Sequence, residues 1–264
     1  MATTPVPAGG SRRSWRDYVR ALGRSHRKAS AQLSSSLPLL YHLEELRRRL
    51  FMALAAVALT TTLSFMFVEQ LVDFLTVPIG GRAALTSIEI TENIAIFMRV
   101  SLLCGVAGGM PFVVYHALRF ILPGLTPRER NWLLLGVPLA SLLFLAGVAF
   151  AWYVMIPTAV PFLTSFLGIT TQVRPSNYFE FITTLMFWLG VSFQMPLVAL
   201  LLARLKLITA RQLAGAWRHA VVGIAVVAAA ITPTVDPVNM SLVMLPLGGL
   251  YLISILLAYL ARRG

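Results

Sequence analysis

Apolar residues along this chain gather into six long runs, which short polar stretches separate from one another. The runs cover residues 50–68, 94–115, 132–153, 178–203, 217–231 and 238–260. A helix needs about 20 predominantly apolar residues to cross a hydrocarbon core that is about 30 Å thick. The pattern therefore predicts an all-α, polytopic membrane protein with six transmembrane helices.

The fifth run is the shortest of the six. Its uninterrupted apolar part is residues 220–231, and Pro233 follows closely. At 1.5 Å per residue this part reaches only about 18 Å, well short of a hydrocarbon core of about 30 Å. We therefore expect that the polar groups at its ends lie deep, or that the bilayer is thinner around it.

The composition supports a membrane protein and excludes an ordinary soluble domain. Hydrophobic residues make up 58% of the chain and charged residues 12%, and the mean hydropathy is +0.78. These values lie far from the usual balance of soluble domains. The single cysteine, Cys104, lies in an apolar run and has no second cysteine with which to form an internal disulfide.

Basic residues indicate how the helices are oriented, because Lys and Arg accumulate in cytoplasmic loops. With six spans and a cytoplasmic N-terminus, 19 of the 22 basic residues fall on the cytoplasmic side. Arg82 and Arg174 fall outside, and Arg99 lies within the second span. We therefore predict that both termini face the cytoplasm. The net charge of +12 then reflects topology and attraction to anionic membrane lipids, rather than binding to nucleic acid.

Residues 1–37 differ in composition from the rest of the chain. They contain seven basic residues, seven serines and one acidic residue, Asp17. Such a segment is typical of a disordered tail or of an organellar transit peptide. The predicted organisation is a basic, Ser-rich cytoplasmic tail over residues 1–37 and a membrane domain over residues 38–261.

Two charged motifs lie directly beside apolar runs, at the predicted cytoplasmic rim. In the first, residues 41–50 read YHLEELRRRL, and their spacing allows Glu44 to pair with Arg48 and Glu45 to pair with Arg49. The second is FILPGLTPRERN at residues 120–131, where Thr126, Pro127 and Glu129 fit the N-cap, N1 and N3 positions of a helix. The residues alone leave a structural role and a binding role open for both motifs.

Patterns that support catalysis are absent from the sequence, which contains no HExxH pair, no GxSxG elbow and no P-loop. The four histidines have no second ligand at helical spacing. Arg99 is the one plausible ionisable group inside a span, and we expect it to extend toward an interface or to pair with Glu92. We therefore expect a protein that is not an enzyme and that requires no metal or other cofactor.

Several motifs together carry a resemblance to TatC, the core subunit of the twin-arginine protein translocase, over about residues 38–260. The family motif HLxELRxRL matches residues 42–50, and FxxPGLxxxER matches residues 120–130. A TPxxD turn and a PLxxLY stretch match residues 232–236 and 246–251. Prolines also stand where TatC has them, at Pro78, Pro111, Pro138 and Pro196. The order and spacing of these matches make the resemblance specific.

The resemblance implies a receptor that binds twin-arginine signal peptides and helps to export folded proteins, driven by the proton-motive force. Glu45 and Glu129 would receive the two signal arginines, while Leu46, Arg47 and Phe120 would shape the surrounding patch. Implied partners are single-span proteins of the TatA and TatB type, with self-association in a multi-subunit complex. The implied fold is a concave bundle with short fifth and sixth helices, in a bacterial plasma membrane or alternatively a thylakoid membrane.

This chain departs from the family pattern in its apolar spans. TatC proteins commonly carry a glutamate in the fourth span, where this chain has Gln194, which cannot titrate. Leu252 and Met240 also replace residues that are usual in the family. Gln194, Thr232 and Asp236 are the predicted partner-facing or intramembrane polar residues. A secondary transporter of small solutes is the alternative function, although its expected internal repeats and midplane polar sites are not evident in the sequence.

Overall fold

The computed structural model describes residues 42–121, 127–165, 173–232 and 237–261, with side chains at all of these except residues 121 and 127–134. The chain divides after Phe51 into two compact units, residues 1–51 and 52–264. The described part of the first unit, residues 42–51, is helical, and the second unit contains every other described element. Strand pairing among the described residues is limited to one bridge between Leu85 and Val173. The predicted all-α class is therefore confirmed.

The first helix covers residues 42–64 and leads into a group of short helices. These are η1 (Phe65–Phe67), α2 (Val68–Thr76), η2 (Val77–Ile79) and η3 (Arg82–Ala84). Two consecutive glycines separate η2 from η3. Gly80 and Gly81 have φ angles of 90° and 93°, which residues with a Cβ rarely adopt, so glycine suits both positions.

The second and third spans are longer than the sequence predicted. Helix α3 covers Glu92–Ile121, and α4 covers Pro127–Phe150. The predicted start of α4 at Pro127 is confirmed. Proline suits this position because the first turn of a helix leaves its N–H groups unpaired, and proline has no N–H to leave unpaired. A π-helical turn, η5 (Ala151–Met155), then continues α4 into α5 (Ile156–Thr164).

The fourth span was predicted as one helix over residues 178–203, and this is wrong in one respect. The structure divides it into α6 (Pro175–Ser192) and α7 (Met195–Arg204), with the break at Phe193 and Gln194. Pro196 lies at the start of α7, where it cannot donate the backbone hydrogen bond that would continue α6. A short helix, α8 (Ala210–Gly215), follows and begins with a capping box of Thr209 and Gln212.

The last two helices differ in length. Helix α9 covers Trp217–Ile231, which matches the predicted short fifth run. Helix α10 covers Pro237–Ala261 and has 25 residues, or about 37 Å at 1.5 Å per residue. The expected short sixth helix is therefore wrong, because this helix begins at Pro237 and takes in the whole predicted apolar run over residues 238–260.

Among the described residues, five helical segments are long and apolar enough to cross a membrane. They cover His42–Ile79, Glu92–Phe120, Leu135–Thr164, Pro175–Arg204 and Pro237–Ala261. Helix α9 is apolar but shorter. These lengths support a multi-pass membrane protein in which α9 is shorter than the other apolar helical segments.

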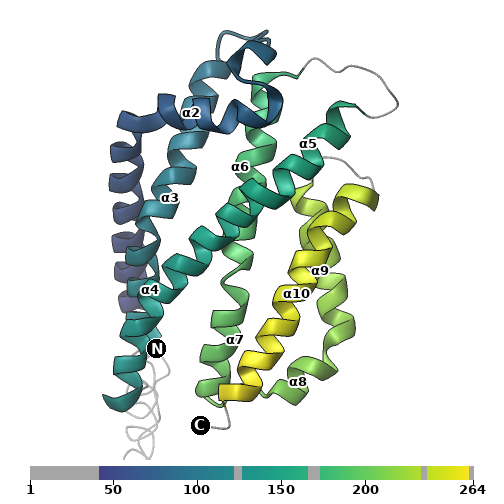
Figure 1. The fold of residues 1–264 in the computed structure, drawn as a ribbon. Helices are drawn as coiled ribbons and strands as arrows, with labels where there is room; N and C mark the ends of the chain where they lie inside the picture. The colour runs from purple at the N-terminus through teal and green to yellow at the C-terminus, as the bar shows by residue number, and fades with distance from the viewer. Residues whose placement is uncertain (1–41, 122–126, 166–172, 233–236, 262–264) are drawn as a thin grey trace, which may run out of the picture. The chain divides into compact units, whose positions relative to one another are not determined.

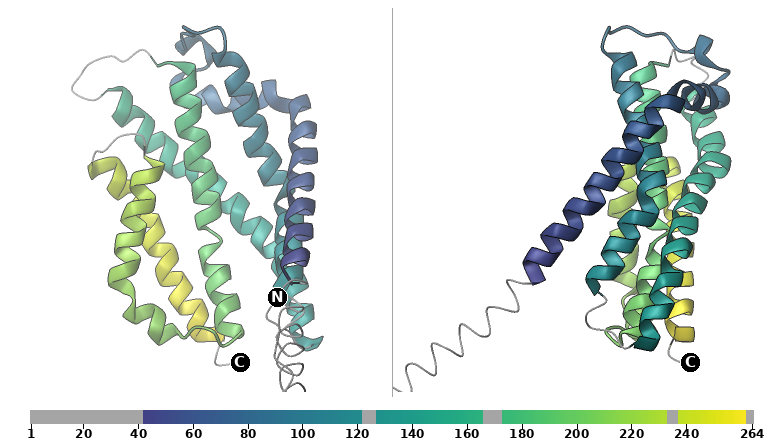
Figure 2. Two further views of the ribbon diagram at one scale, coloured as in Figure 1. Left: turned by 180° about the vertical axis from the view of Figure 1, so that it is seen from behind. Right: turned by 90° about the vertical axis from the view of Figure 1, so that its left-hand side faces the viewer.

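Within the second unit, helices α3, α4 and α6 pack against one another, and α10 packs along α7 and α9 (Figure 1). Figure 2 shows the same neighbours from two other sides. Helix α4 begins, and α7 and α10 end, at the same end of this unit, whereas α2 and the start of α6 lie at the opposite end. We refer to these as the α4-start end and the α2 end. The largest fully buried side chains include Phe144, Phe179, Ile182 and Leu247.

Small residues let two helix pairs approach closely. A Cβ added at Gly105 of α3 would lie 2.6 Å from the Cα of Thr61, and the Thr60 hydroxyl donates a hydrogen bond to the Gly105 carbonyl at 2.6 Å. A Cβ at Gly147 of α4 would lie 2.8 Å from the Cα of Gly190 in α6. Close backbone approach of this kind is a principal source of helix association in membranes, because lipid removes the hydrophobic advantage.

Candidate functional site

The first rim motif forms a helix in the first unit, and one of its two carboxylates is held in a partly buried ion pair. The Arg49 Nη2 group donates to the Glu45 Oε1 atom at 2.9 Å, and the two side chains are 19% and 18% exposed. The predicted pairing of Glu45 with Arg49 is therefore confirmed. It arises because residues four apart lie on the same face of a helix.

The neighbouring carboxylate is different. Glu44 lies 4.0 Å from Arg47, and these side chains are 73% and 83% exposed. The predicted partner of Glu44 was Arg48, and this is wrong, since the structure brings Arg47 nearer at three residues' spacing. Leu46 is 42% exposed and Leu43 and Leu50 are more so, which leaves an apolar surface beside the charged groups.

The second rim motif lies in the second unit, at the α4-start end. Phe120 is half-buried in the last turn of α3, and Glu129 is in the first turn of α4. The side chain of Glu129 lies outside the described residues, as do residues 122–126. Of the predicted signal-binding residues, the structure thus places Glu45, Leu46 and Arg47 on one helical turn, Phe120 at the end of α3 and Glu129 at the start of α4.

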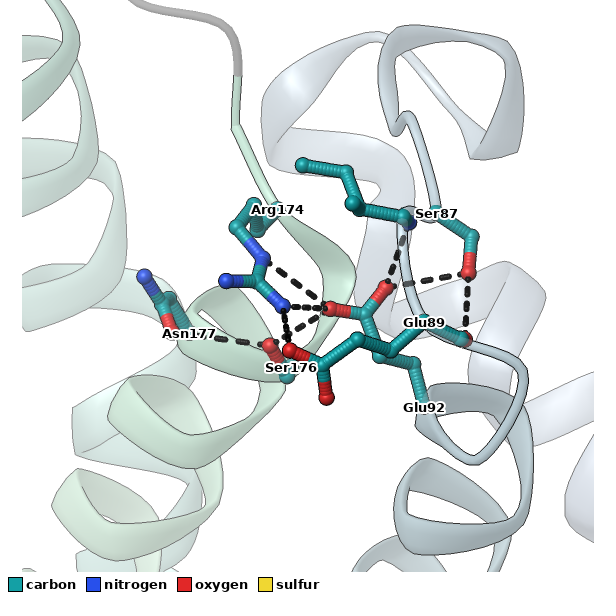
Figure 3. Close-up of polar contacts among 7 residues, drawn as sticks. Ser87, Glu89, Glu92, Arg174, Ser176 and Asn177 are labelled. Carbon is teal, nitrogen blue, oxygen red and sulfur yellow. Dashed lines mark hydrogen bonds and ion pairs between the residues drawn. The ribbon is translucent and has the colours of Figure 1, made fainter.

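A polar cluster at the α2 end was not predicted from the sequence (Figure 3). Glu92, whose side chain is 2% exposed, accepts hydrogen bonds from Arg174 Nε at 3.0 Å and Arg174 Nη2 at 2.6 Å. Its carboxylate also accepts from the hydroxyls of Ser87 and Ser176 and from the Ile88 amide. Arg174 contacts Glu89 at 2.9 Å as well. The cluster joins the start of α3 to the start of α6.

Electrostatics favour the charged state of this cluster. The carboxylates of Glu89 and Glu92 raise the pKa of the Arg174 guanidinium above its ordinary value, because both accept its hydrogen bonds. The buried Glu92 carboxylate is compensated by several donors, as a buried charge requires. The cluster was missed because its two halves, residues 87–92 and residues 174–176, lie more than 80 residues apart in the chain. The sequence did contain a signal for this pair. Glu92 and Arg174 are oppositely charged, and each lies beside a predicted span on the predicted outer side.

The predicted pairing of Arg99 with Glu92 is wrong. Arg99 of α3 lies 3.3 Å from Glu180 of α6, while Glu92 is bound to Arg174. Arg99 lies about two turns after Glu92, the first residue of α3. Glu180 lies between one and two turns after Pro175, the first residue of α6, so the two side chains stand at similar heights on adjacent helices. This ion pair therefore adds a second bridge between α3 and α6, inside segments long enough to span a membrane.

Gln194 lies at the break between α6 and α7. Its Nε2 group donates a hydrogen bond to the Ala140 carbonyl of α4 at 2.9 Å. The position therefore bonds through an amide donor, as an uncharged polar residue can. This hydrogen bond connects the break between α6 and α7 to α4.

We expect Gln194→Leu to lower stability, because leucine cannot donate to the Ala140 carbonyl and would leave polar groups unpaired, at a cost of about 1 to 3 kcal/mol. Gln194→Glu should be tolerated, since a glutamate that keeps its proton can donate the same bond. Thermal unfolding in detergent and export of a reporter between pH 6 and 8 would measure both effects. The matched control is Val198→Leu, one turn further on and 50% exposed. A Gln194→Leu variant as stable as this control would show that the bond contributes nothing.

The remaining predicted polar residues are Thr232, at the end of α9, and Asp236. Thr232 is buried, and its hydroxyl donates to the Ala228 carbonyl at 2.9 Å. Its hydroxyl therefore bonds to the backbone of its own helix. Asp236 lies outside the described residues. Tyr251, in the PLGGLY stretch, donates a hydrogen bond to the Leu213 carbonyl and so joins α10 to α8.

No group of three or more His, Cys, Asp or Glu side chains that could hold a metal ion occurs among the described residues. The described rim instead offers a carboxylate in the Glu45–Arg49 pair and an exposed apolar surface on the same helix. Chemically, such a surface can bind a cationic group that is followed by an apolar segment.

Comparisons with known proteins agree with the motifs. The family model for TatC, described as Sec-independent protein translocase protein, matches residues 41–246. A TatC protein of Deinococcus radiodurans is 36% identical over 237 residues, covering 86% of this chain and 88% of that protein. A chloroplastic TATC of Arabidopsis thaliana is 39% identical over 214 residues, covering 80% of this chain and 63% of that protein. A crystal structure of the twin arginine translocase receptor TatC has a TM-score of 0.74 at 30% identity, covering 84% of this chain and 99% of that one.

Proposed function

The chain belongs to the TatC family of Sec-independent protein translocase proteins, and we propose that it binds twin-arginine signal peptides through Glu45 and Glu129. It is a multi-pass membrane protein and a component of the twin-arginine translocase. The family match leaves the alternative of a small-solute transporter without support. The observation that carries the proposal is that both rim motifs lie within the matched residues 41–246.

Physical chemistry supports carboxylates as the receptor groups. A guanidinium presents a planar fork that a carboxylate accepts through two parallel hydrogen bonds, whereas an ammonium group binds as a point charge. Two adjacent arginines therefore require two anionic acceptors. Glu45 and Glu129 supply one each, Arg47 and Phe120 flank them in the sequence motifs, and Leu46 offers an exposed apolar contact.

The partners follow from membership of a translocase complex. We propose that this chain is a receptor and scaffold, not an enzyme, and that it assembles with single-span proteins of the TatA and TatB type. Self-association and contact with membrane lipids belong to the same proposal, as does the use of the proton-motive force. Gln194, Thr232 and Asp236 are proposed as polar positions that support this assembly.

The proposed organisation is a basic cytoplasmic tail over residues 1–37 and a membrane domain over residues 38–261, with six spans and both termini in the cytoplasm. Support comes from the charge distribution and from the second unit, where α4 begins and α10 ends at the same end. A bacterial plasma membrane is the proposed location, with a thylakoid membrane as the alternative.

Cysteine labelling tests this topology. In a Cys104→Ser background, we expect an impermeant thiol reagent outside intact cells to label cysteines placed at Ser87 and Ser176. Cysteines placed at Ser35 and Gly264 should stay unlabelled until the membrane is permeabilised, because the positive-inside distribution places both termini in the cytoplasm. Labelling at Gly264 in intact cells would require an odd number of spans.

The experiment that tests the function is binding of a synthetic signal peptide with two adjacent arginines, compared with the same peptide carrying two lysines. The purified protein should bind the first and discriminate against the second.

A further inference from the structure

The carboxylate of Glu45 accepts a hydrogen bond from a residue of its own helix. Arg49, one helical turn further on, donates to the Glu45 Oε1 atom at 2.9 Å. A guanidinium from this chain therefore lies where the proposed function requires a guanidinium from the signal peptide. The structural role and the receptor role of Glu45 compete for the same oxygen atoms.

The internal ion pair between Arg49 and Glu45 is weaker than the ion pair that an incoming arginine can form with Glu45. The contact between Arg49 and Glu45 joins one guanidinium nitrogen to one carboxylate oxygen. An external arginine is free to approach the carboxylate with both prongs of its fork, and a bidentate pair is stronger and more specific than a single contact. A lysine would exchange one point contact for another and gain little.

We propose that Arg49 is a built-in competitor for the arginine-binding carboxylate, so that a signal peptide must displace it from Glu45 in order to bind. This inference rests on the proposed function of Glu45. Displacement adds the same cost to every cationic ligand. Weak ligands, such as a twin-lysine peptide, then fall below useful occupancy, while twin-arginine peptides still bind.

The neighbouring arginines do not share this position. Arg47 is 83% exposed and lies 4.0 Å from Glu44, at the limit of an ion pair. Arg48 is exposed and, at three residues' spacing, faces the same side of the helix as Glu45, yet among the described residues no ion pair joins the two. The Glu45–Arg49 pair is only 18% and 19% exposed, so solvent screens it less than a fully exposed pair. Arg48 is therefore a matched control, because it carries the same charge one residue away.

The test uses the purified full chain in detergent and labelled peptides with two arginines or two lysines. We expect Arg49→Met to tighten binding of the twin-arginine peptide about two- to fivefold, since partly buried pairs contribute slightly more than exposed ones. The twin-lysine peptide should gain by the same factor, so the ratio of the two affinities stays unchanged. Arg49→Lys, which keeps the charge without the fork, should give a smaller gain.

Arg48→Met separates competition from the general effect of removing a positive charge near a cationic ligand. If Arg48→Met tightens binding as much as Arg49→Met does, competition at Glu45 is overturned. Weaker binding by Arg49→Met, in a protein with unchanged thermal unfolding, would also overturn it and would make Arg49 a peptide contact.

Glu45→Gln distinguishes this inference from the function on which it rests. Loss of peptide binding in Glu45→Gln, without any gain in Arg49→Met, would retain Glu45 as a receptor and reject only the competitor. Unchanged binding in Glu45→Gln would reject the receptor role of Glu45 itself. Both roles stand if Glu45→Gln loses affinity and Arg49→Met gains it.

Discussion

Changing Glu129 to Gln is expected to weaken binding of a twin-arginine signal peptide about tenfold or more, because a charge-assisted hydrogen bond contributes about 1.5 to 3 kcal/mol. Glutamine keeps the shape of the side chain and most of its ability to cap α4, which begins at Pro127. The substitution therefore separates a receptor carboxylate from a residue that only starts a helix. Peptide titration by fluorescence anisotropy measures the effect.

Glu45→Gln should weaken binding to a similar extent, and Glu44 provides its matched control. Glu44 lies on the same helical turn, is 73% exposed and occupies a variable position of the family motif. We therefore expect Glu44→Gln to leave affinity nearly unchanged. Equal losses at Glu44 and Glu45 would indicate a general effect of negative charge at the rim. Unchanged affinity in both Glu45→Gln and Glu129→Gln, with normal thermal unfolding, would return both residues to structural roles.

The positions of the spans could be predicted from the sequence. A long apolar run favours transfer into lipid by its own composition and length, almost independently of the other runs. The bounds of α9 were predicted to the residue. The predicted start of α4 at Pro127 also rested on local chemistry, since the constraints that proline imposes act within one turn. Such features depend on neighbours in the sequence and need no knowledge of the fold.

Contacts between helices could not be predicted in the same way. The partner of Arg99 depends on the relative height of α3 and α6, and the structure places Glu180 beside it. The Glu92–Arg174 pair joins residues on different helices, and composition carries no information about which charges meet. The break at Gln194 had a local signal in Pro196, but Pro111 and Pro138 lie inside helices that continue through them. Proline alone therefore does not decide whether a membrane helix is interrupted.

At the site, the sequence identified the pairing of Glu45 with Arg49, since both lie on one short helical segment. It could not reveal that the side chains of this pair are much less exposed than those of the Glu44–Arg47 contact, because spacing along a helix does not determine exposure. Family resemblance supplied the receptor roles of Glu45 and Glu129. The structure adds that the first of these carboxylates has an internal partner, Arg49, which we propose a signal peptide displaces.

Lengthening α9 should impair export of a twin-arginine reporter severely while leaving signal-peptide binding intact. Helix α9 has 15 residues, which reach about 22 Å at 1.5 Å per residue, against a hydrocarbon core of about 30 Å. We infer that the bilayer thins beside α9 and that this thinning assists the passage of cargo. Inserting four leucines after Val226 adds about 6 Å and removes most of the mismatch.

The matched control changes the apolar volume of α9 without changing its length. Val221, Val222, Val226 and Val227 are 37% to 64% exposed, and replacing all four by leucine keeps the 15 residues and the buried contacts of Ile224 and Ala228. Export should persist in this control, because a helix of unchanged length leaves the mismatch with the bilayer in place. Peptide binding in the insertion variant shows that the rim site is still folded. Full export by the insertion variant, measured beside that control, would exclude thinning at α9 as a step in transport. A helix whose length matches the hydrocarbon core does not thin the bilayer around it.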